Sequence, residues 1–299
     1  MLGDPYDQVI DSAAFAAGPR SDALPRSVGA DIARSWLLVP ATRPESFDAA
    51  ARSRADAVIL DIEDAVDPLN KAQARDSVLS WLDEGGRAWV RINDATSSFW
   101  ADDLSALSGN PNLLGVVLAK TEAAEQVRAT AAKLSGTVPI IALVESAVGI
   151  EEAVNIARAP GAFRLAFGSG DFRRDTGMSA DAEAMAYPRA RLVVASRVGG
   201  LPGPIDGPTV GTSMPILREN AVITVSMGMT GKLCLAVEQT SVVNEVISPT
   251  PTEVAWALDF LADFERRGRV IRDGSDLPRL GRAQKIQNLA ASFGVNPAR

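Results

Sequence analysis

The sequence I-I-A-L-V-E at residues 140–145 decides the fold, together with L-A-F-G-S-G-D at residues 165–171. Each begins as a short apolar run typical of a β-strand, ends in a carboxylate (Glu145 or Asp171), and is followed by helix-like sequence. In an α/β barrel the carboxyl ends of the strands form the rim that carries the active site. Two carboxylates there would suit Mg²⁺, with water and substrate as its other ligands. Taken singly, either acid is more often a helix N-cap or a solvated loop residue.

The same rhythm of apolar run and helix-like segment extends over most of the chain. Further strands are expected at residues 36–39, 57–60, 88–93, 113–119, 201–206 and 231–235. Short buried strands alternating with helices predict a parallel sheet, and about eight of them predict an α/β fold closed as a (β/α)₈ TIM barrel. A doubly wound sheet that binds a dinucleotide typically has a Gly-rich turn after the first strand. P-A-T-R-P at residues 40–44 contains no glycine, so this alternative is disfavoured. The β-branched segment 221–229 makes the seventh helix the weakest prediction.

Three parts are expected along the chain. Residues 1–33 lack a clear period and are interpreted as an N-terminal arm, and residues 34–250 as the TIM-barrel catalytic domain. Residues 251–299 would form a C-terminal helical extension with helices at 252–267 and near 282–290.

The composition excludes several classes of chemistry. The 299 residues contain no histidine, so a histidine general base, a histidine-ligated zinc site and a Ser-His-Asp triad are ruled out. The net charge of −7 gives no reason to expect nucleic acid or an anionic membrane as a partner. The single cysteine, Cys234, fits a reducing cytoplasm, and we expect a cytoplasmic protein with no membrane span.

Charged residues gather where the other strands are expected to end. Asp61, Glu63 and Asp64 follow the second strand, Arg91 lies at the end of the third, and Lys120 follows the fourth. An arginine among carboxylates is either their structural counter-ion or a clamp for an anionic substrate, and the residues alone leave both readings open.

Eight stretches in a fixed order resemble one known superfamily. They are R-S-W-L-L-V-P (34–40), A-D-A-V-I-L-D-I-E-D-A-V (55–66), K-A-Q-A-R (71–75), V-R-I-N (90–93), A-K (119–120), A-L-V-E-S-A-V-G (142–149), F-G-S-G-D (167–171) and G-K-L-C (231–234). The pattern resembles the HpcH/HpaI aldolase and citrate lyase superfamily, in particular its citrate lyase β-subunit-like branch, which includes citramalyl-CoA and malyl-CoA lyases.

The resemblance implies roles for the charged residues at the rim. Glu145 and Asp171 would bind Mg²⁺, with Glu145 also facing the substrate, and Arg91 would hold the carboxylate or carbonyl of the substrate. Glu63 would be a catalytic acid near the metal or Arg91. Lys71 and Arg75 would contact the phosphates of CoA, unless they lie on a solvated helix face.

The resemblance also implies an oligomer and a shared site. Members are commonly homotrimers, and in the citramalyl-CoA lyase type the C-terminal tail supplies an aspartate to a neighbouring subunit. The stretch S-D-L-P at residues 275–278 makes Asp276 the candidate acid/base, with a surface loop as the alternative.

The expected activity is Mg²⁺-dependent cleavage of a 3-hydroxyacyl-CoA thioester into acetyl-CoA and a keto acid, by an enzyme of the carbon–carbon lyase class. The alternatives are an aldolase on free keto acids, which in that branch uses a histidine base, and a homologue that binds ligand without turnover. The last is favoured by one departure, because the family's I-H-P-x-Q turn reads L-A-V-E-Q at residues 235–239. The loss of the I-H-P turn at Leu235, Ala236 and Val237 leaves open whether CoA is bound. The sequence also leaves open the acyl group, the reaction direction and the need for a partner subunit.

Overall fold

The structure is a computed structural model that describes residues 28–298. Its strands form a closed barrel in which each strand pairs in parallel with the next and the last pairs with the first. The strands are β1 (Ser35–Pro40), β2 (Ala57–Asp61), β3 (Ala88–Ile92), β4 (Leu113–Leu118), β5 (Ile140–Val144), β6 (Ala162–Phe167), β7 (Ile205–Asp206) and β8 (Gly231–Cys234). The predicted (β/α)₈ TIM barrel is therefore confirmed.

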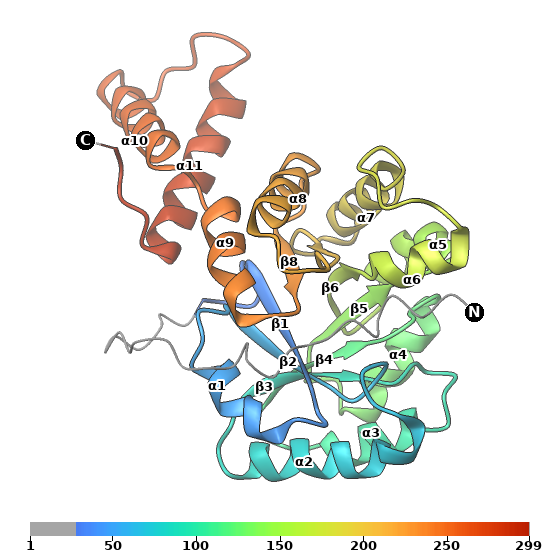
Figure 1. Cartoon of the computed structure of the whole chain (residues 1–299). Helices are drawn as coiled ribbons and strands as arrows, with labels where there is room; N and C mark the ends of the chain where they lie inside the picture. Colours follow the sequence, from blue (N-terminus) through green and yellow to red (C-terminus); the bar gives the residue numbers. More distant parts are fainter. Residues whose placement is uncertain (1–27, 299) are drawn as a thin grey trace.

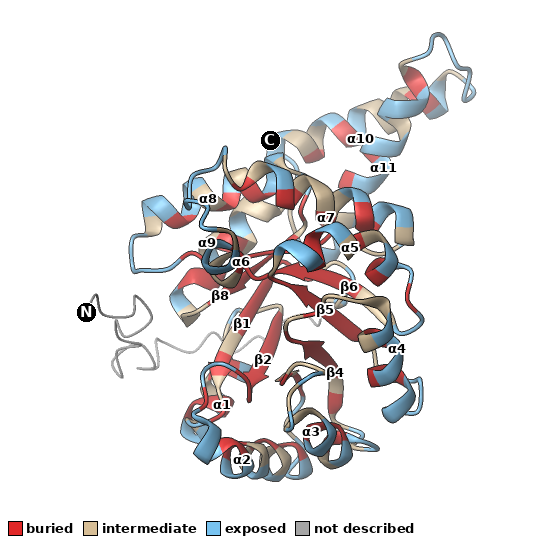
Figure 2. Ribbon diagram, turned by 90° about the vertical axis from the view of Figure 1, so that its right-hand side faces the viewer, coloured by how far each residue is buried: buried red, intermediate tan, exposed pale blue. Residues whose placement is uncertain are grey.

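The helices pack around the barrel, and the last two extend away from it (Figure 1). They are α1 (Phe47–Ala51), α2 (Lys71–Asp83), α3 (Trp100–Leu107), α4 (Ala124–Lys133), α5 (Ala147–Ala157), α6 (Ser169–Thr176), α7 (Ala186–Gly199), α8 (Met214–Ser226), α9 (Val237–Ile247), α10 (Pro251–Arg266) and α11 (Asp276–Phe293), with short 3₁₀ turns η3 (Pro44–Ser46) and η4 (Pro68–Asn70). Most strand residues are buried, whereas the outer faces of the helices are exposed (Figure 2).

The weakly predicted seventh helix is present, and the last helix differs from the sequence-based expectation in where it begins. The β-branched stretch after residue 221 is the second half of α8, whose N-cap is Ser213. Thr224 is buried in it and donates its hydroxyl proton to Asp206. Tertiary contact thus overrides weak helix propensity. The final helix begins at Asp276, earlier than expected.

Alternation along the strands separates the barrel interior from the surrounding layer. Ile59, Trp89, Leu143 and Leu233 belong to a buried cluster inside the barrel, while their strand neighbours pack against the helices. Residues two apart on a strand share a face, so the interior rows continue towards the carboxyl rim.

The opposite end of the barrel is closed by an aromatic and arginine plug. Trp36 and Trp89 meet edge to face with ring centroids 5.3 Å apart. The fully buried Arg164 donates to the carbonyl oxygens of Ala30 and Ala33, each at 3.0 Å. Of the proposed arm, residues 1–27 lie outside the described residues, and residues from 28 onward approach this end of the barrel.

A buried ion network ties β7 and β8 to the outer helices. Asp206 accepts from Arg189 Nε at 2.9 Å and from the Thr224 hydroxyl, and Lys232 Nζ lies 3.5 Å away. Burial alone would raise the pKa of Asp206, but Lys232 and Arg189 hold it below its ordinary value. The carboxylate therefore stabilises the fold at neutral pH, and this stabilisation is lost as the pH falls through the folded-state pKa.

Removing Asp206 is expected to destabilise the protein strongly. Asp206→Ala leaves Arg189 and Lys232 buried without their carboxylate, which typically costs about 3–5 kcal/mol in the free energy of unfolding. Urea denaturation followed by circular dichroism measures it. The matched control is Glu245→Ala, which breaks the exposed pair with Arg218 and should change the midpoint far less. Equal effects of the two substitutions would contradict this account.

The C-terminal helices form a second small core. Val254, Ala257, Ala283, Ile286 and Ala290 pack together between α10 and α11. The Arg34 guanidinium lies 3.9 Å from the centre of the Phe293 ring and connects α11 to the start of the barrel. Among residues 28–298, no helix is long and apolar enough to cross a membrane.

Candidate active site

The inward-facing rows end in charged residues at the carboxyl rim. Asp61 follows Ile59 by two positions, Arg91 follows Trp89, and Glu145 follows Leu143. The period of two that fills the barrel with apolar side chains therefore brings a carboxylate, a guanidinium and a second carboxylate to the same end of the interior.

Arg91 is held mainly by Asp61. Its Nε and Nη2 donate to the two carboxylate oxygens of Asp61 at 2.7 and 2.6 Å, a bidentate pair. Its Nη1 lies 3.3 Å from Glu63 Oε2, without the alignment of a hydrogen bond. Of the two roles left open by the sequence, the structure displays the counter-ion; the substrate clamp remains a prediction.

Lys120 connects three acidic residues from two other strand ends. Its backbone N–H donates to Glu145 Oε1 at 2.8 Å, and its ammonium donates to Glu63 Oε1 and, at 2.8 Å, to Asp64 Oδ1. The backbone adopts a left-handed conformation with φ of 47°, which is uncommon for a residue other than glycine and marks a locally constrained site. Burial alone would lower the pKa of Lys120, but the hydrogen bonds to Asp64 and Glu63 raise it above its ordinary value.

Glu145 lies buried just beyond the end of β5. Burial raises its pKa to about 8; Arg91 opposes this shift, and the nearby charges of Asp171 and Glu63 add to it. Burial likewise raises the pKa of Glu63 to about 6, against the pull of Arg91. Ionising these carboxylates together is unfavourable in free energy, because they are poorly solvated and repel one another.

Asp171 does not lie at a strand end as expected. β6 ends at Phe167, Gly168 is the residue before α6, and Asp171 lies in the first turn of that helix. A helix N-terminus favours a negative charge, but burial and the adjacent Asp64 nevertheless raise the pKa of Asp171. Arg174 Nη2 lies 3.3 Å from the carboxylate on the same helix.

Glu145 and Asp171 line one cavity of about 510 Å³. The cavity is lined by Asp94, Thr96, Lys120, Glu122, Gln126, Glu145, Ser146, Asp171, Arg174 and Asp175. Three of these, Lys120, Glu145 and Asp171, are rim residues predicted from the sequence. Most of the others lie in the loops and first helical turns after β3 to β5, and their position just after a strand end is the signal that could have found them. Arg174 and Asp175 lie in the last turn of α6 and carry no such signal.

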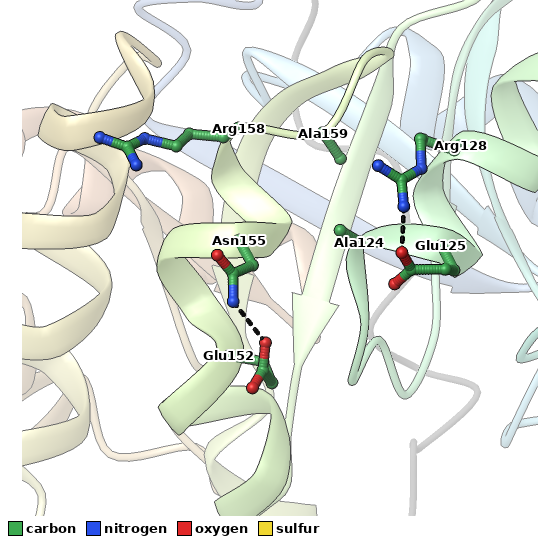
Figure 3. Close-up of a pocket in the computed structure, with 7 residues that line it drawn as sticks. All are labelled: Ala124, Glu125, Arg128, Glu152, Asn155, Arg158 and Ala159. Atoms are coloured by element: carbon green, nitrogen blue, oxygen red, sulfur yellow. Dashed lines mark hydrogen bonds and ion pairs between the residues drawn. The ribbon is translucent and has the colours of Figure 1, made fainter.

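A second depression lies outside the barrel between α4 and α5 (Figure 3). Two pairs of its polar side chains bond within their own helix, Arg128 with Glu125 and Asn155 with Glu152. None of the predicted site residues lines it.

Lys71 and Arg75 have partners within the chain. Lys71 is 6% exposed, and its ammonium donates to the carbonyl oxygens of Ile62 and Glu63 and to Asn93 Oδ1. Arg75 Nε donates to the buried Asp103 at 3.0 Å. The alternative of a solvated helix face is therefore wrong for Lys71, which holds the loop carrying Glu63. Contacts of these residues with CoA phosphates remain a prediction.

Asp276 lies at the start of α11, and no contact joins it to the rim of its own chain among the described residues. Its side chain is buried and accepts from Arg267 Nη1 at 2.7 Å and from the backbone N–H of Arg272 at 2.9 Å. The bonds from Arg267 and Arg272 hold its pKa far below the ordinary range. Both partners belong to the mostly exposed segment 267–275, so these contacts also fit the surface-loop alternative, and a role in a neighbouring subunit remains a prediction.

The turn at residues 235–239, which departs from the family pattern in sequence, is held together by hydrogen bonds. The buried Gln239 side chain accepts from the Leu235 N–H at 2.8 Å and donates to the Thr209 carbonyl oxygen at 3.1 Å. Ala236 is the residue before α9 and provides no side-chain cap. The glutamine of the expected I-H-P-x-Q pattern therefore still fastens this turn without the histidine and proline.

The fold and rim together define a barrel enzyme with a carboxylate-rich active site at the carboxyl ends of its strands. Residues 34–236 match the family model HpcH/HpaI aldolase/citrate lyase, and residues 252–294 match HpcH/HpaI aldolase C-terminal domain. The chain belongs to the HpcH/HpaI aldolase/citrate lyase family and is a carbon–carbon lyase.

Curated relatives cover most of the chain. An L-malyl-CoA/beta-methylmalyl-CoA lyase of Rhodobacter capsulatus is 29% identical over 78% of this chain and 84% of its own length. A citrate lyase subunit beta-like protein of Deinococcus radiodurans is 30% identical over 79% and 88%, respectively. A (3S)-malyl-CoA thioesterase of Cereibacter sphaeroides is 29% identical over 88% and 97%.

A solved structure extends the likeness to the C-terminal region. CitE from Mycobacterium tuberculosis, in complex with magnesium, acetoacetate and coenzyme A, superposes with a TM-score of 0.73 at 29% identity. The match covers 87% of this chain and 99% of that one.

The residues present fit a divalent cation. Five carboxylates (Asp61, Glu63, Asp64, Glu145, Asp171) face the paired cations Arg91 and Lys120, so negative charge predominates. Among residues 28–298 no cluster of three or more candidate metal ligands is present. A pair of carboxylates nevertheless suits Mg²⁺, which usually keeps several water or substrate ligands.

Gly168 should be essential for the position of Glu145. A Cβ at residue 168 would overlap the Glu145 carboxylate, so Gly168→Ala must displace it. We expect Mg²⁺ affinity, measured by isothermal titration calorimetry, to fall by about tenfold or more, since second-shell changes at metal sites commonly cost about 10–100-fold. Gly281→Ala is the matched control, because a Cβ there meets no atom within 4 Å. Unchanged Mg²⁺ affinity in Gly168→Ala would refute the assignment of Glu145.

Proposed function

We propose that the protein is a Mg²⁺-dependent lyase that cleaves a 3-hydroxyacyl-CoA thioester, of the malyl-, citramalyl- or citryl-CoA type, into acetyl-CoA and a keto acid. The observation that carries the proposal is the pair Glu145 and Asp171 in one cavity, beside the rim cations Arg91 and Lys120. The names of the relatives support it, as does the CitE complex with magnesium, acetoacetate and coenzyme A.

Glu145 and Asp171 would hold the metal. When bound, Mg²⁺ supplies Lewis acidity that lowers the pKa of the substrate hydroxyl and offsets the charge of the two carboxylates. Arg91 is fixed by Asp61 through Nε and Nη2, and its Nη1, which lies 3.3 Å from Glu63 Oε2 without a hydrogen bond, would serve a substrate oxygen. A rigid, buried donor of this kind stabilises charge that develops during the reaction.

Proton transfer needs an acid/base on each side of the broken bond. A base takes the hydroxyl proton, the electrons of the C–C bond form the thioester enolate, and a proton delivered to the enolate carbon completes acetyl-CoA. Glu63, with a pKa raised to about 6 and contacts to Arg91 and Lys120, is suited to the first step. Asp276 of a neighbouring subunit would serve the second, once that subunit's site replaces Arg267 and Arg272 as its partners.

This role of Asp276 requires a homo-oligomer, with a trimer or a multiple of it as the expected state. The α10–α11 pair projects from the barrel and has a core of its own, which suits an element that packs on a neighbour (Figure 1). A cytoplasmic location remains an expectation from the single cysteine.

The direct test is a coupled assay of the purified protein. Malyl-, citramalyl- and citryl-CoA are offered with Mg²⁺, and the released keto acid, acetyl-CoA and free CoA are each measured. Keto acid and acetyl-CoA in equal amounts, abolished by EDTA, would support the lyase.

The rival activities give different products in the same assay. Free CoA without keto acid would favour a thioesterase, such as the Cereibacter sphaeroides relative by its name. Cleavage of free hydroxy acids alone would favour an aldolase on free keto acids. No turnover with Mg²⁺ still bound would favour a homologue that only binds ligand, as the altered turn at Ala236 suggests.

Asp171→Ala is expected to remove Mg²⁺ binding while leaving the fold intact. Asp171 lies in the first turn of α6 with its side chain 13% exposed, and among the described residues its carboxylate pairs with the exposed Arg174 and lies beside Asp64. Calorimetric titration of Mg²⁺ measures the loss, and the circular dichroism melting curve checks the fold. Asp175 lines the same cavity, so Asp175→Ala is the matched control and should retain most of the affinity. Wild-type Mg²⁺ affinity in Asp171→Ala would sink the proposal.

Subunit complementation tests the role of Asp276. Glu145→Ala and Asp276→Asn should each be inactive alone. Refolded together, they should regain part of the activity, because a mixed oligomer contains sites with an intact rim from one chain and Asp276 from the other. Activity in Asp276→Asn alone, or none in the mixture of correctly assembled variants, would argue against a shared site.

A further inference from the structure

Few cations are available to a ligand inside the cavity. Among its lining residues only Lys120 and Arg174 are basic, and the Arg174 side chain is 69% exposed and pairs with Asp171. Arg91, expected to be the substrate clamp, is not among the lining residues, and Asp61 occupies two of its nitrogens. Lys120 is therefore the one firmly placed cation on the cavity wall within residues 28–298.

Lys120 is held from both ends. Its backbone N–H is fixed by Glu145, in the left-handed conformation with φ of 47°. Its ammonium is fixed by Glu63 and Asp64. Side-chain freedom is thus already restricted before any ligand arrives, so a ligand that binds Lys120 loses little to ordering it.

One donor of the ammonium remains unused. An ammonium carries three N–H groups, and within the described part of the chain only Glu63 and Asp64 accept from this one. The side chain is 35% exposed and lines the same cavity as Glu145 and Asp171. A free, charged donor beside the paired carboxylates is a ready partner for an anionic oxygen.

We propose that Lys120 Nζ donates its third N–H to the carboxylate of the keto-acid part of the substrate, and that it makes the enzyme selective for acids over neutral ketones. This inference rests on the proposed function, because that function supplies the keto acid. It assigns Lys120 a contact with substrate in addition to its bonds within the rim.

Lys120→Met tests the inference with two small probes. Pyruvate and its neutral analogue pyruvamide are titrated calorimetrically into the oligomeric protein, with and without Mg²⁺. Wild type should prefer pyruvate. Lys120→Met should lose about 10- to 100-fold in pyruvate affinity, the usual worth of one charged hydrogen bond, and little in pyruvamide affinity. A merely structural role would weaken both probes alike, so the ratio of the two affinities is the decisive readout.

Three further variants complete the experiment. Lys120→Gln keeps N–H donors for Glu63 and Asp64 without the charge and should lose the same selectivity. This variant keeps the test valid if Lys120→Met does not fold. Lys120→Arg should retain much of the preference for pyruvate. Lys133→Met is the matched control, since Lys133 lies on α4 over the Trp100 ring and outside the cavity.

The two proposals fail in different ways. An unchanged pyruvate-to-pyruvamide ratio in Lys120→Met and Lys120→Gln would overturn the role of Lys120 and leave the lyase standing. Wild-type protein that binds no Mg²⁺ would overturn the proposed function, and the titrations without metal would still decide the role of Lys120. Wild-type protein that does not prefer pyruvate over pyruvamide in either condition would overturn the inference directly.

Discussion

Repulsion among buried carboxylates is the constraint on which this structure depends. The rim of the barrel gathers acidic side chains from the ends of β2 and β5 and from the first turn of α6, in a place where water solvates them poorly. Arg91 and Lys120 offset part of this charge, Arg91 through Asp61 and Lys120 through Glu63 and Asp64. Burial raises the pKa of Glu145 to about 8, and the charges of Asp171 and Glu63 add to this shift against the effect of Arg91. A divalent cation between Glu145 and Asp171 would relieve this repulsion and would also serve the proposed chemistry.

The rest of the fold keeps this arrangement rigid. The interior rows of apolar residues fix where Asp61, Arg91 and Glu145 emerge, and Lys71 fastens the loop that carries Glu63. Gly168 leaves the space that Glu145 occupies. The chain contains no histidine, so a site of this kind must tune carboxylates by burial and by cationic neighbours rather than use an imidazole.

The sequence predicted the fold and the central residues for an identifiable reason. Eight short apolar runs alternate with helix-like segments, and Glu145 and Arg91 each stand where such a run ends. It could not predict that Asp171 lies in the first turn of α6, because L-A-F-G-S-G-D does not show where the strand ends and the helix begins. It left open a solvated helix face for Lys71 and a surface loop for Asp276, because the burial of a charged residue depends on partners distant in sequence, such as Asn93, or on how a loop folds back, as for Arg267. The left-handed backbone of Lys120 has no signature in the residue type.

The central claim is that Glu145 and Asp171 together bind one divalent cation. The most direct measurement is a crystal structure of the protein soaked in Mn²⁺, with the metal located by its anomalous scattering. The account predicts one strong peak in the cavity, at bonding distance from a carboxylate oxygen of each residue, which for Mg²⁺ is about 2.0–2.1 Å. A peak bound elsewhere, or no peak between Glu145 and Asp171 at saturating metal, would contradict it.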